Sequence, residues 1–342
     1  MVLAEIGAAL VLGGACATAH PPARPPARPA PTSSASDAIA APSAEAAAPP
    51  TERRRRVLAR GGSYGNPTSM VVDERAVYAT TGGANVLEIP RDGSGKSTPV
   101  FANATVAGSL AIDAHYLYVA SGATFLVPSE GAVIRVDKRT KAPEVIARHR
   151  VPRALSVDAT GVWFGDEVQP GAWRVAKTGG KPVALAGIRG TVSGIDHDEA
   201  RVYFAATEYA PVQRGAVYVA PMAGGKATVL VDGLTDAMGV AVYDGAVWYN
   251  DNGRVMMLPP GGGAPSTISD RGSTIAFARR TSALFWCAVS LSDASGHVGA
   301  IERAERGPMA VSVEPAPVGV AADEISVFFA DAFTGEVVAV EF

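Results

Sequence analysis

Carboxylate and amide side chains recur in short polar segments between apolar stretches of the chain. Their oxygens are the ligands that Ca²⁺ prefers, and a bound cation would support hydrolase or lyase chemistry. The residues of this kind are Glu208, Asp236, Asp251 and Asp331, with Asn250 and Asn252. We take Glu208, Asp236 and Asp251 as the metal candidates. The alternative is a solvated acidic surface, which is the commoner state of charged loops.

No catalytic motif is recognisable in the sequence, so the catalytic residues are unassigned. Residues 90–97 end like a phosphate-binding loop, but Pro90 stands in place of the first glycine and no helical pattern follows. There is no GxSxG nucleophile motif, and no pair of histidines has metal-ligand spacing. Our leading hypothesis is therefore a non-enzymatic binding protein without a cofactor. The alternative is a metal-dependent hydrolase or lyase with Ca²⁺ as its cofactor.

Composition narrows the class of partner. The 342 residues carry a net charge of −3, which argues against nucleic acid because its binders usually have a basic excess. Cys16 and Cys287 are too few for a disulfide framework or a zinc site built from cysteines. We expect a monomer that binds an unknown protein or small molecule.

One phrase recurs along residues 55–342: an apolar stretch, an aspartate, three spacer residues, a β-branched residue and an aromatic one. The repeated aspartates are Asp73, Asp113, Asp158, Asp198 and Asp323, and the aromatic residues are Tyr78, Tyr118, Trp163, Tyr203, Trp248 and Phe328. Because these residues recur, we predict that the aspartates hold turns and that the aromatic residues pack between the repeated units. His115 and His197 lie in or beside these turns and are predicted to be surface residues.

Further short apolar segments follow each copy and are bounded by Gly, Pro and Asp, which is the pattern of β-strands. Four strands in about 40 residues are typical of a β-propeller blade. We therefore predict an all-β fold, a seven-bladed β-propeller of four-stranded antiparallel blades. A spare strand at 55–59 is expected to close the ring by pairing into the last blade, which removes an exposed edge. The copies at 239–249 and 273–286 are irregular, so six blades are the alternative.

Candidate binding residues follow from this topology. In a four-stranded meander, the start of the first strand and the end of the second lie on the same face. The polar residues in the loops of that face differ between copies, so the blade itself does not require them, and such loops commonly carry function. The candidates are Asn66, Arg153, Asp166, Glu167, Glu208, Asp236, Asn250, Asp251, Asn252 and Asp331, and the same loops contain Arg189, Tyr209, Asp270 and Arg271.

Residues 1–16 have the features of an export signal. The apolar run at 6–15 is too short to span a membrane, and Gly14 and Ala15 before Cys16 resemble the lipobox of bacterial lipoproteins, whose cysteine is lipidated. Residues 17–54 are rich in Ala and Pro and predict a disordered linker. We expect an exported protein, either a membrane-anchored lipoprotein or a periplasmic or extracellular protein. The alternative is a cytoplasmic protein with an apolar N-terminus.

The repeats at 55–342 resemble the NHL-like and YWTD-like propeller repeats of bacterial envelope proteins. Residues 248–251 (WYND) and 328–331 (FFAD) are similar to the Tyr-Trp-Thr-Asp strand, and residues 89–94 (IPRDGS) to the turn that follows it. YWTD-like propellers are usually six-bladed, and related propellers include lactonases and a streptogramin lyase, whose sites find no match here residue by residue. The resemblance implies a ligand- or protein-binding propeller tethered to the cell envelope, with a lactonase-like metal-dependent enzyme as the alternative.

Overall fold

The computed structural model describes residues 54–60, 69–81, 85–102, 107–122, 131–270, 273–290, 295–302, 309–314, 317–331 and 334–342. All of these belong to one of the two compact units of the chain, Pro50–Phe342. Residues 1–53, which include Cys16 and all of the predicted linker except Arg54, lie outside the described residues, as do Asn66 and Arg271. Among the residues described, none belongs to a helix long and apolar enough to cross a membrane.

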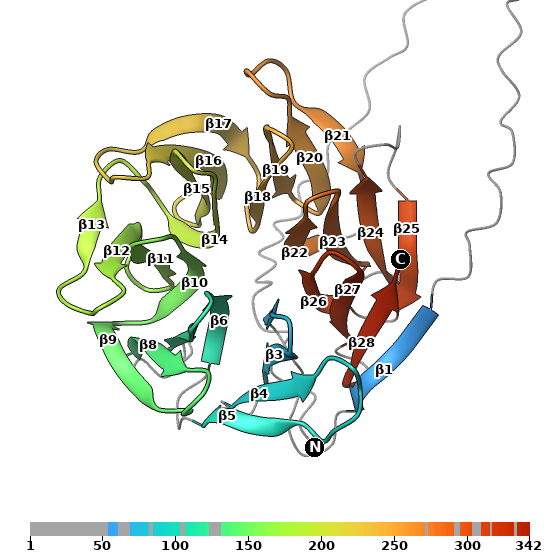
Figure 1. The fold of residues 1–342 in the computed structure, drawn as a ribbon. Helices are drawn as coiled ribbons and strands as arrows, with labels where there is room; N and C mark the ends of the chain where they lie inside the picture. Colours follow the sequence, from blue (N-terminus) through green and yellow to red (C-terminus); the bar gives the residue numbers. More distant parts are fainter. Residues whose placement is uncertain are drawn as a thin grey trace, which may run out of the picture. The chain divides into compact units, whose positions relative to one another are not determined.

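The described residues form seven four-stranded sheets, the blades of a ring (Figure 1). Blade 1 comprises β2 (Met70–Val72), β3 (Ala76–Thr80), β4 (Asn85–Pro90) and β5 (Thr98–Ala102). Blade 2 comprises β6 (Ala107–Ile112), β7 (Tyr116–Ser121), β8 (Gly131–Asp137) and β9 (Pro143–His149). Blade 3 comprises β10 (Pro152–Val157), β11 (Gly161–Asp166), β12 (Ala172–Ala176) and β13 (Val183–Leu185). Blade 4 comprises β14 (Thr191–His197), β15 (Arg201–Glu208), β16 (Arg214–Pro221) and β17 (Thr228–Leu234).

The two irregular copies of the sequence also form complete sheets. Blade 5 comprises β18 (Val240–Tyr243), β19 (Ala246–Asp251), β20 (Arg254–Leu258) and β21 (Ser266–Ser269). Blade 6 comprises β22 (Ser273–Arg280), β23 (Ala283–Ser290), β24 (Ser295–Glu302) and β25 (Met309–Glu314). Blade 7 comprises β1 (Arg54–Arg60), β26 (Pro317–Ala322), β27 (Ser326–Asp331) and β28 (Glu336–Glu341). The predicted all-β propeller of four-stranded antiparallel blades is confirmed.

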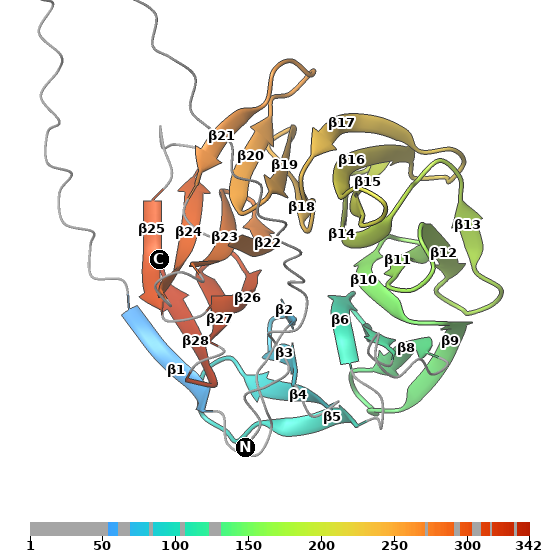
Figure 2. The same ribbon diagram turned by 180° about the vertical axis from the view of Figure 1, so that it is seen from behind.

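The first described strand completes the last blade. In blade 7 the strand order is β1-β28-β27-β26, and β1 pairs antiparallel with β28 from Arg54 opposite Glu341 to Arg60 opposite Glu336 (Figure 2). Arg55 and Arg60 both form ion pairs with the Glu336 carboxylate, at 3.3 and 2.8 Å. The ring is therefore closed by the N-terminal strand, as predicted.

The second strand of a blade is the most buried one. Every residue of β11, β19 and β27 is buried, whereas the outermost strands β5 and β17 are mainly exposed. Neighbouring blades cover both faces of a second strand, so its sequence is a continuous apolar run rather than an alternating one.

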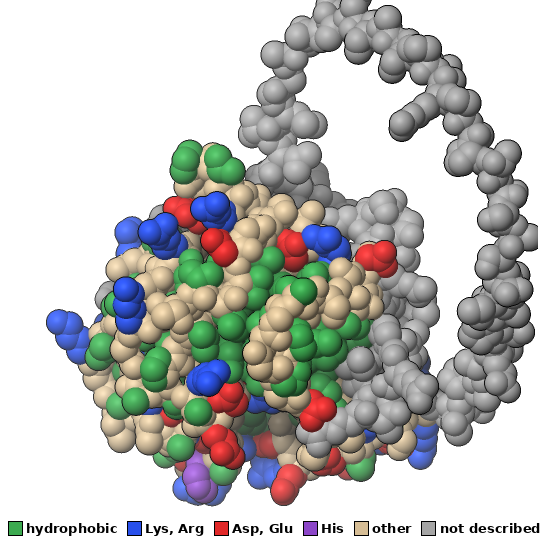
Figure 3. All heavy atoms as spheres, turned by 90° about the horizontal axis from the view of Figure 1, so that it is seen from above, with side chains coloured by type: hydrophobic (Ala, Val, Ile, Leu, Met, Phe, Trp, Pro, Cys, Tyr) green, Lys and Arg blue, Asp and Glu red, His purple; other side chains and the backbone are tan. Residues whose placement is uncertain are grey.

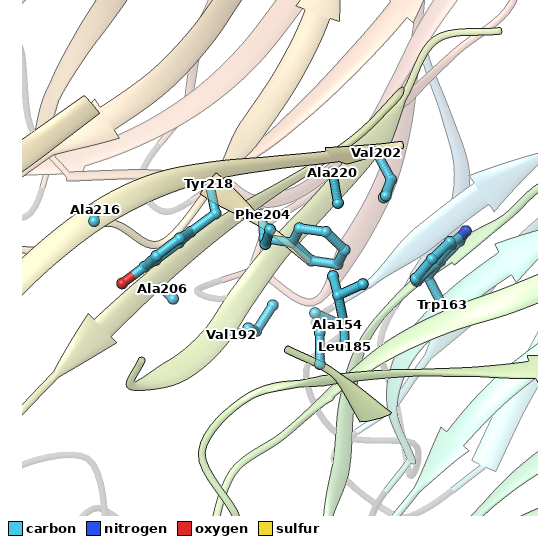
Figure 4. Packing of buried hydrophobic residues seen from close by; sticks show 12 residues of the cluster. Ala154, Trp163, Leu185, Val192, Val202, Phe204, Ala206, Ala216, Tyr218 and Ala220 are labelled. Carbon is cyan, nitrogen blue, oxygen red and sulfur yellow. The ribbon is translucent and has the colours of Figure 1, made fainter. Parts of the chain in front are cut away.

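The hydrophobic core is divided into clusters that lie between consecutive blades. Figure 4 shows the cluster between blades 3 and 4, where Trp163 meets Phe204 with ring centroids 5.9 Å apart in an edge-to-face arrangement. The repeated aromatic residues Tyr78, Tyr118, Trp163, Tyr203, Trp248 and Phe328 all belong to such clusters. Their predicted packing between units is therefore confirmed.

The repeated aspartates hold the turns between first and second strands. Asp113 Oδ1 accepts hydrogen bonds from the backbone N–H groups of His115 and Tyr116, at 2.9 and 2.8 Å. Its Oδ2 accepts hydrogen bonds from the Tyr118 hydroxyl at 2.9 Å and from Lys177 Nζ of the next blade at 2.8 Å. Equivalent turns form at Asp73, Asp158, Asp198 and Asp323. The predicted structural function of these aspartates is confirmed.

Candidate functional site

A cavity of about 600 Å³ is lined by residues of the first strand of every blade. These first strands lie around the centre of the ring (Figure 1). Small residues occupy corresponding positions in the cavity wall, namely Ser69, Ser109, Ala154, Gly194, Gly239, Ala276 and Gly319. They are small because neighbouring first strands approach closely, and a Cβ atom on Gly194 would lie 2.8 Å from the Cα atom of Gly239. Backbone N–H groups of the next blade donate to Ser69 and Ser109 Oγ, at 3.1 and 3.2 Å.

The two faces of the ring carry different connections. The loop face carries the loops that lead into first strands and those that leave second strands. The turn face carries the aspartate turns and the turns between third and fourth strands. All of the candidate binding residues within the described part of the chain come from loop-face connections or the strand ends beside them.

Two charged side chains line the central cavity among the residues described there, Arg153 and Glu167. Arg153 Nη1 donates a hydrogen bond to Glu167 Oε2 at 2.9 Å, and the Arg153 side chain is 47% exposed. A β-bulge separates Arg153 from Leu155, and Ala154 within it has a φ of 47°, which is unusual for a residue with a Cβ. Bulges beside functional sites commonly redirect a side chain, and here the bulge places Arg153 at the loop-face opening.

Tyr209 extends this opening from the neighbouring blade. It lies in the loop at 209–213 between β15 and β16, and 55% of its surface is exposed. Partial burial raises the pKa of Tyr209, the charges of Asp236 and Glu167 raise it further, and the charge of Arg153 lowers it. Arg153, Glu167, Tyr209 and Asp236 therefore share one electrostatic neighbourhood, which we call the mouth cluster. Blades 3 and 4 and the loop before blade 5 supply it.

Asp236 is the mouth-cluster carboxylate that its surroundings fix in place. The Thr207 hydroxyl donates a hydrogen bond to Asp236 Oδ1 at 2.9 Å, and the same hydroxyl oxygen accepts one from the Ala237 N–H at 2.9 Å. Thr207 is fully buried, so the carboxylate is anchored to the end of β15. The cluster thus combines an exposed phenol with one cation and two carboxylates.

Other candidate carboxylates serve the fold instead. Asp166 is fully buried and accepts hydrogen bonds from the N–H groups of Val151, Val168 and Gln169, at 2.7 to 2.8 Å. His149 Nδ1 lies 2.5 Å from Asp166 Oδ2. Burial raises the pKa of Asp166, but these hydrogen bonds outweigh it and lower the pKa below its ordinary value.

Asp331 holds a turn in the same way, and Asp251 bonds to the loop before blade 5. Asp331 is fully buried and accepts a hydrogen bond from the Thr334 N–H at 2.7 Å. Asp251 accepts one from the Thr235 N–H at 2.8 Å and forms an ion pair with Arg254 at 2.5 Å. These oxygens are engaged by the protein itself and are not presented to a ligand.

The two candidate asparagines within the described residues, Asn250 and Asn252, are also structural. Asn250 is buried, and its Oδ1 accepts hydrogen bonds from the N–H groups of Met238 and Gly239, at 2.7 and 2.6 Å. Asn252 and Gly253 form the two-residue hairpin loop between β19 and β20, with φ values of 47° and 86°. Asn-Gly is favoured there because both positions need positive φ.

The three metal candidates do not come together. In the part of the chain that the structure describes, no group of three or more His, Cys, Asp or Glu side chains is arranged to hold a metal ion. Asp251 is paired with Arg254, Asp236 belongs to the mouth cluster, and Glu208 lines a separate cavity at the rim of the ring. Glu208, Asp236 and Asp251 thus do not form the metal site that the sequence suggested.

We expect millimolar Ca²⁺ or Mg²⁺ and excess EDTA to leave the Tm of the protein unchanged, because the described carboxylates do not converge. A metal ion that binds the folded protein and is present at 100 times its Kd would add about 2.7 kcal/mol to the free energy of unfolding, which a thermal melt would detect. A rise of several degrees that disappears in Asp236→Asn would contradict this expectation and restore the metal-dependent alternative.

Sequence reasoning missed one polar network on the turn face. Arg279 of blade 6 forms an ion pair with Asp196 of blade 4 and donates hydrogen bonds to the carbonyl oxygens of Val242 and His197, at 2.7 and 3.1 Å. His197 Nδ1 lies 2.9 Å from Ser156 Oγ of blade 3, so this histidine is half-buried and bonded, not simply a surface residue as predicted. The sequence held one indication of this network. Asp196 is charged, whereas the regular copies have an uncharged residue at the same position, namely Val71, Ala111, Ser156 and Ala321.

Comparison with known proteins supports the fold. No protein-family model matches the chain, and no curated protein matches it. Among solved structures, the chain resembles virginiamycin B lyase from Staphylococcus aureus with a TM-score of 0.66 and 14% identity, over 85% of this chain and 100% of that one.

Two further structures come from protein complexes. A chain of the mitotic checkpoint complex matches with a TM-score of 0.62 and 12% identity, over 84% of this chain and 93% of that one. A chain of the nidogen–laminin complex matches with a TM-score of 0.52 and 14% identity, over 73% and 93%. At these identities the similarity shows the fold alone, and the fold occurs in both enzymes and protein complexes.

Proposed function

We propose that this propeller binds a protein partner on its loop face, with the mouth cluster at the centre of the contact, and that it does so without catalysis. The observation that carries this proposal is the ion pair of Arg153 and Glu167, whose charges act on Tyr209 together with that of Asp236, beside an exposed apolar loop. Neighbours of the same fold occur in the mitotic checkpoint and nidogen–laminin complexes, which is consistent with a protein-binding function.

The residue types at this surface suit a protein interface. Tyr and Arg are enriched among the residues that contribute most to protein–protein binding. Tyr209 and Val212, both in the loop at 209–213, are 55% and 74% exposed, so a partner would remove apolar surface from water. Arg153 and the two carboxylates around this loop would orient that partner through charge complementarity.

The distribution of charge supports a protein rather than a nucleic acid. Figure 3 shows basic and acidic side chains interspersed on the side of the ring that it draws, without a broad field of one sign. Nucleic-acid binders usually concentrate Lys and Arg on one face. The net charge of −3 agrees with this preference.

We further propose that the propeller is exported and tethered to the cell envelope through lipid on Cys16, on the basis of the N-terminal sequence. Metabolic labelling with a radioactive fatty acid tests this proposal. Label should enter the wild-type protein and be lost in Cys16→Ser, and an unlabelled wild-type protein would contradict it.

Photo-crosslinking tests the proposed contact surface. A photoreactive amino acid placed at Val212 should give a discrete adduct with a partner in the native cell. The matched control is Ile325, which is 60% exposed on the turn face. Tyr209→Ala should lower the yield of the Val212 adduct about tenfold, as expected for a residue worth about 1.4 kcal/mol or more at an interface. Tyr209→Phe should keep most of the yield because it retains the ring.

Two results would overturn the proposal. One is the absence of a protein adduct at Val212 in cells that express the protein normally. The other is an adduct of equal yield at Val212 and Ile325 that does not respond to Tyr209→Ala, because this would mark non-specific contact.

A further inference from the structure

A second cavity, of about 400 Å³, lies at the rim of the ring where blade 3 meets blade 4. It is lined by the connection between β13 and β14 and by residues of β16 and β17. This connection is held against blade 4, because the Ala227 N–H donates a hydrogen bond to the Ala186 carbonyl oxygen at 2.8 Å. The volume falls within the usual range for small-molecule sites, about 300–1,000 Å³.

The floor of this rim cavity is a buried tyrosine. Tyr218 is 5% exposed and belongs to the cluster of Trp163 and Phe204, and Figure 4 shows its hydroxyl oxygen pointing away from those two rings. The hydroxyl oxygen accepts a hydrogen bond from the Arg189 N–H at 3.4 Å. No described residue accepts a hydrogen bond from this hydroxyl, so its hydrogen is available to a ligand in the cavity.

Three cations without ion-pair partners among the described residues line the same cavity as this hydroxyl. Arg189, Arg214 and Lys226 line the cavity, are exposed, and form no ion pair with any described residue. Other arginines of the ring are paired, for example Arg174 with Asp158. Three such cations around one cavity with a buried donor are the features of an anion site.

Two carboxylates limit the charge of the ligand. Glu208 lies opposite Arg214 in the register of β15 and β16, yet it forms no ion pair with Arg214. Asp232 accepts a hydrogen bond from the Gly233 N–H at 2.8 Å. With three cations and two carboxylates, the lining carries a net charge of about +1, which favours a ligand of low negative charge.

We propose that the rim cavity between blades 3 and 4 binds a small organic anion, whose carboxylate or phosphate group lies among Arg189, Arg214 and Lys226 and accepts a hydrogen bond from the Tyr218 hydroxyl. The two guanidinium groups can bind such a group through paired N–H donors, and Lys226 adds a point charge. The apolar wall, formed in part by Ala216 and Val229, would contact the body of the ligand. This site is separate from the mouth cluster and does not depend on the protein-binding proposal.

Equilibrium dialysis of the full chain with radiolabelled inorganic phosphate and, separately, radiolabelled succinate tests the site at constant ionic strength. One site per chain with a Kd below about 1 mM for either probe is expected. Phosphate alone would identify a phosphate ester as the ligand class, and succinate alone a carboxylate, and either result supports the site. Arg214→Gln and Tyr218→Phe should each weaken binding about tenfold, since each removes a hydrogen bond to a charged group.

Removing a negative charge from the cavity lining tests whether binding depends on the charge of the site. Glu208→Gln removes a carboxylate from the lining and should tighten binding severalfold. Lys96→Gln, at an exposed lysine outside the cavity, should leave the Kd unchanged. A thermal melt of each variant confirms that it is folded. A wild-type Kd above about 10 mM for both probes overturns the proposal, as does equal weakening by Lys96→Gln and Arg214→Gln.

Discussion

Removing residues 1–60 is expected to abolish the stable ring, whereas removing residues 1–53 is expected to leave it folded. The two truncations differ by β1, which pairs with β28 and places Leu58 in the cluster between blades 7 and 1. Loss of this strand removes the burial of Leu58 and a row of backbone hydrogen bonds, together worth about 5 kcal/mol or more. It also leaves β28 as an unpaired edge, which promotes association between chains. Size-exclusion chromatography and a thermal melt report both effects.

A point substitution in β1 measures the contribution of the buried Leu58 side chain without removing the strand. Leu58→Asp places an unpaired carboxylate at a position that is 6% exposed and should lower the Tm by about 10 °C or more. Arg54→Asp, at the exposed start of the same strand, should change the Tm by only a few degrees. A Δ1–60 chain that is monomeric and melts like Δ1–53 would show that β1 does not close the ring in solution.

Most of the fold was predictable because its signals are local in the chain. Asp113 and Tyr118 are five residues apart and bond to each other across a single turn, so the repeat is visible without knowledge of the ring. Blade 5 forms a complete sheet although Tyr243 stands at the aspartate position. Strand patterning was therefore sufficient where the turn signal was lost.

The candidate site was harder to predict because two uses of a loop carboxylate look alike in sequence. Asp166 and Asp331 accept hydrogen bonds from backbone N–H groups two or three residues further on, which gives them the same structural function in different blades. Their spacing to the preceding aromatic residue could have indicated this structural function, because Asp166 follows Trp163 and Asp331 follows Phe328 by three residues. Asp251 follows Trp248 by the same interval.

Contacts between blades had no such local signal. The mouth cluster unites residues of blades 3 and 4 with the loop before blade 5, and only the radial placement of the blades makes them neighbours. Asp196 and Arg279 are 83 residues apart and meet across an intervening blade. A repeat pattern specifies that such residues share a face of the ring, but not which of them touch.

Acid is expected to weaken the ring through Asp113. Burial raises the pKa of Asp113, but Lys177, the backbone N–H groups and the Tyr118 hydroxyl outweigh burial and lower the pKa to about 2. The unfolded chain has the ordinary value of about 4. Because the folded pKa is the lower one, this stabilisation is complete above about pH 4 and is lost as the pH falls through about 2. For this one carboxylate the loss amounts to about 2 kcal/mol.

Urea unfolding of the wild type and of Asp113→Asn between pH 2 and pH 7 measures this contribution. The amide that replaces the carboxylate can keep the turn hydrogen bonds but loses the charge. The variant should therefore be about 2 kcal/mol less stable than the wild type at pH 7 and about equally stable near pH 2.

Lys177→Met should remove part of the same pH dependence, because Lys177 Nζ of blade 3 donates a hydrogen bond to Asp113 Oδ2 of blade 2 at 2.8 Å. Asp232→Asn is the control and should leave the profile unchanged, because this exposed aspartate of β17 accepts a hydrogen bond from the adjacent Gly233 N–H and holds no turn between a first and a second strand. Parallel profiles for wild type and Asp113→Asn from pH 7 to pH 2 would show that the turn aspartates stabilise the ring by geometry alone and that their charge contributes nothing.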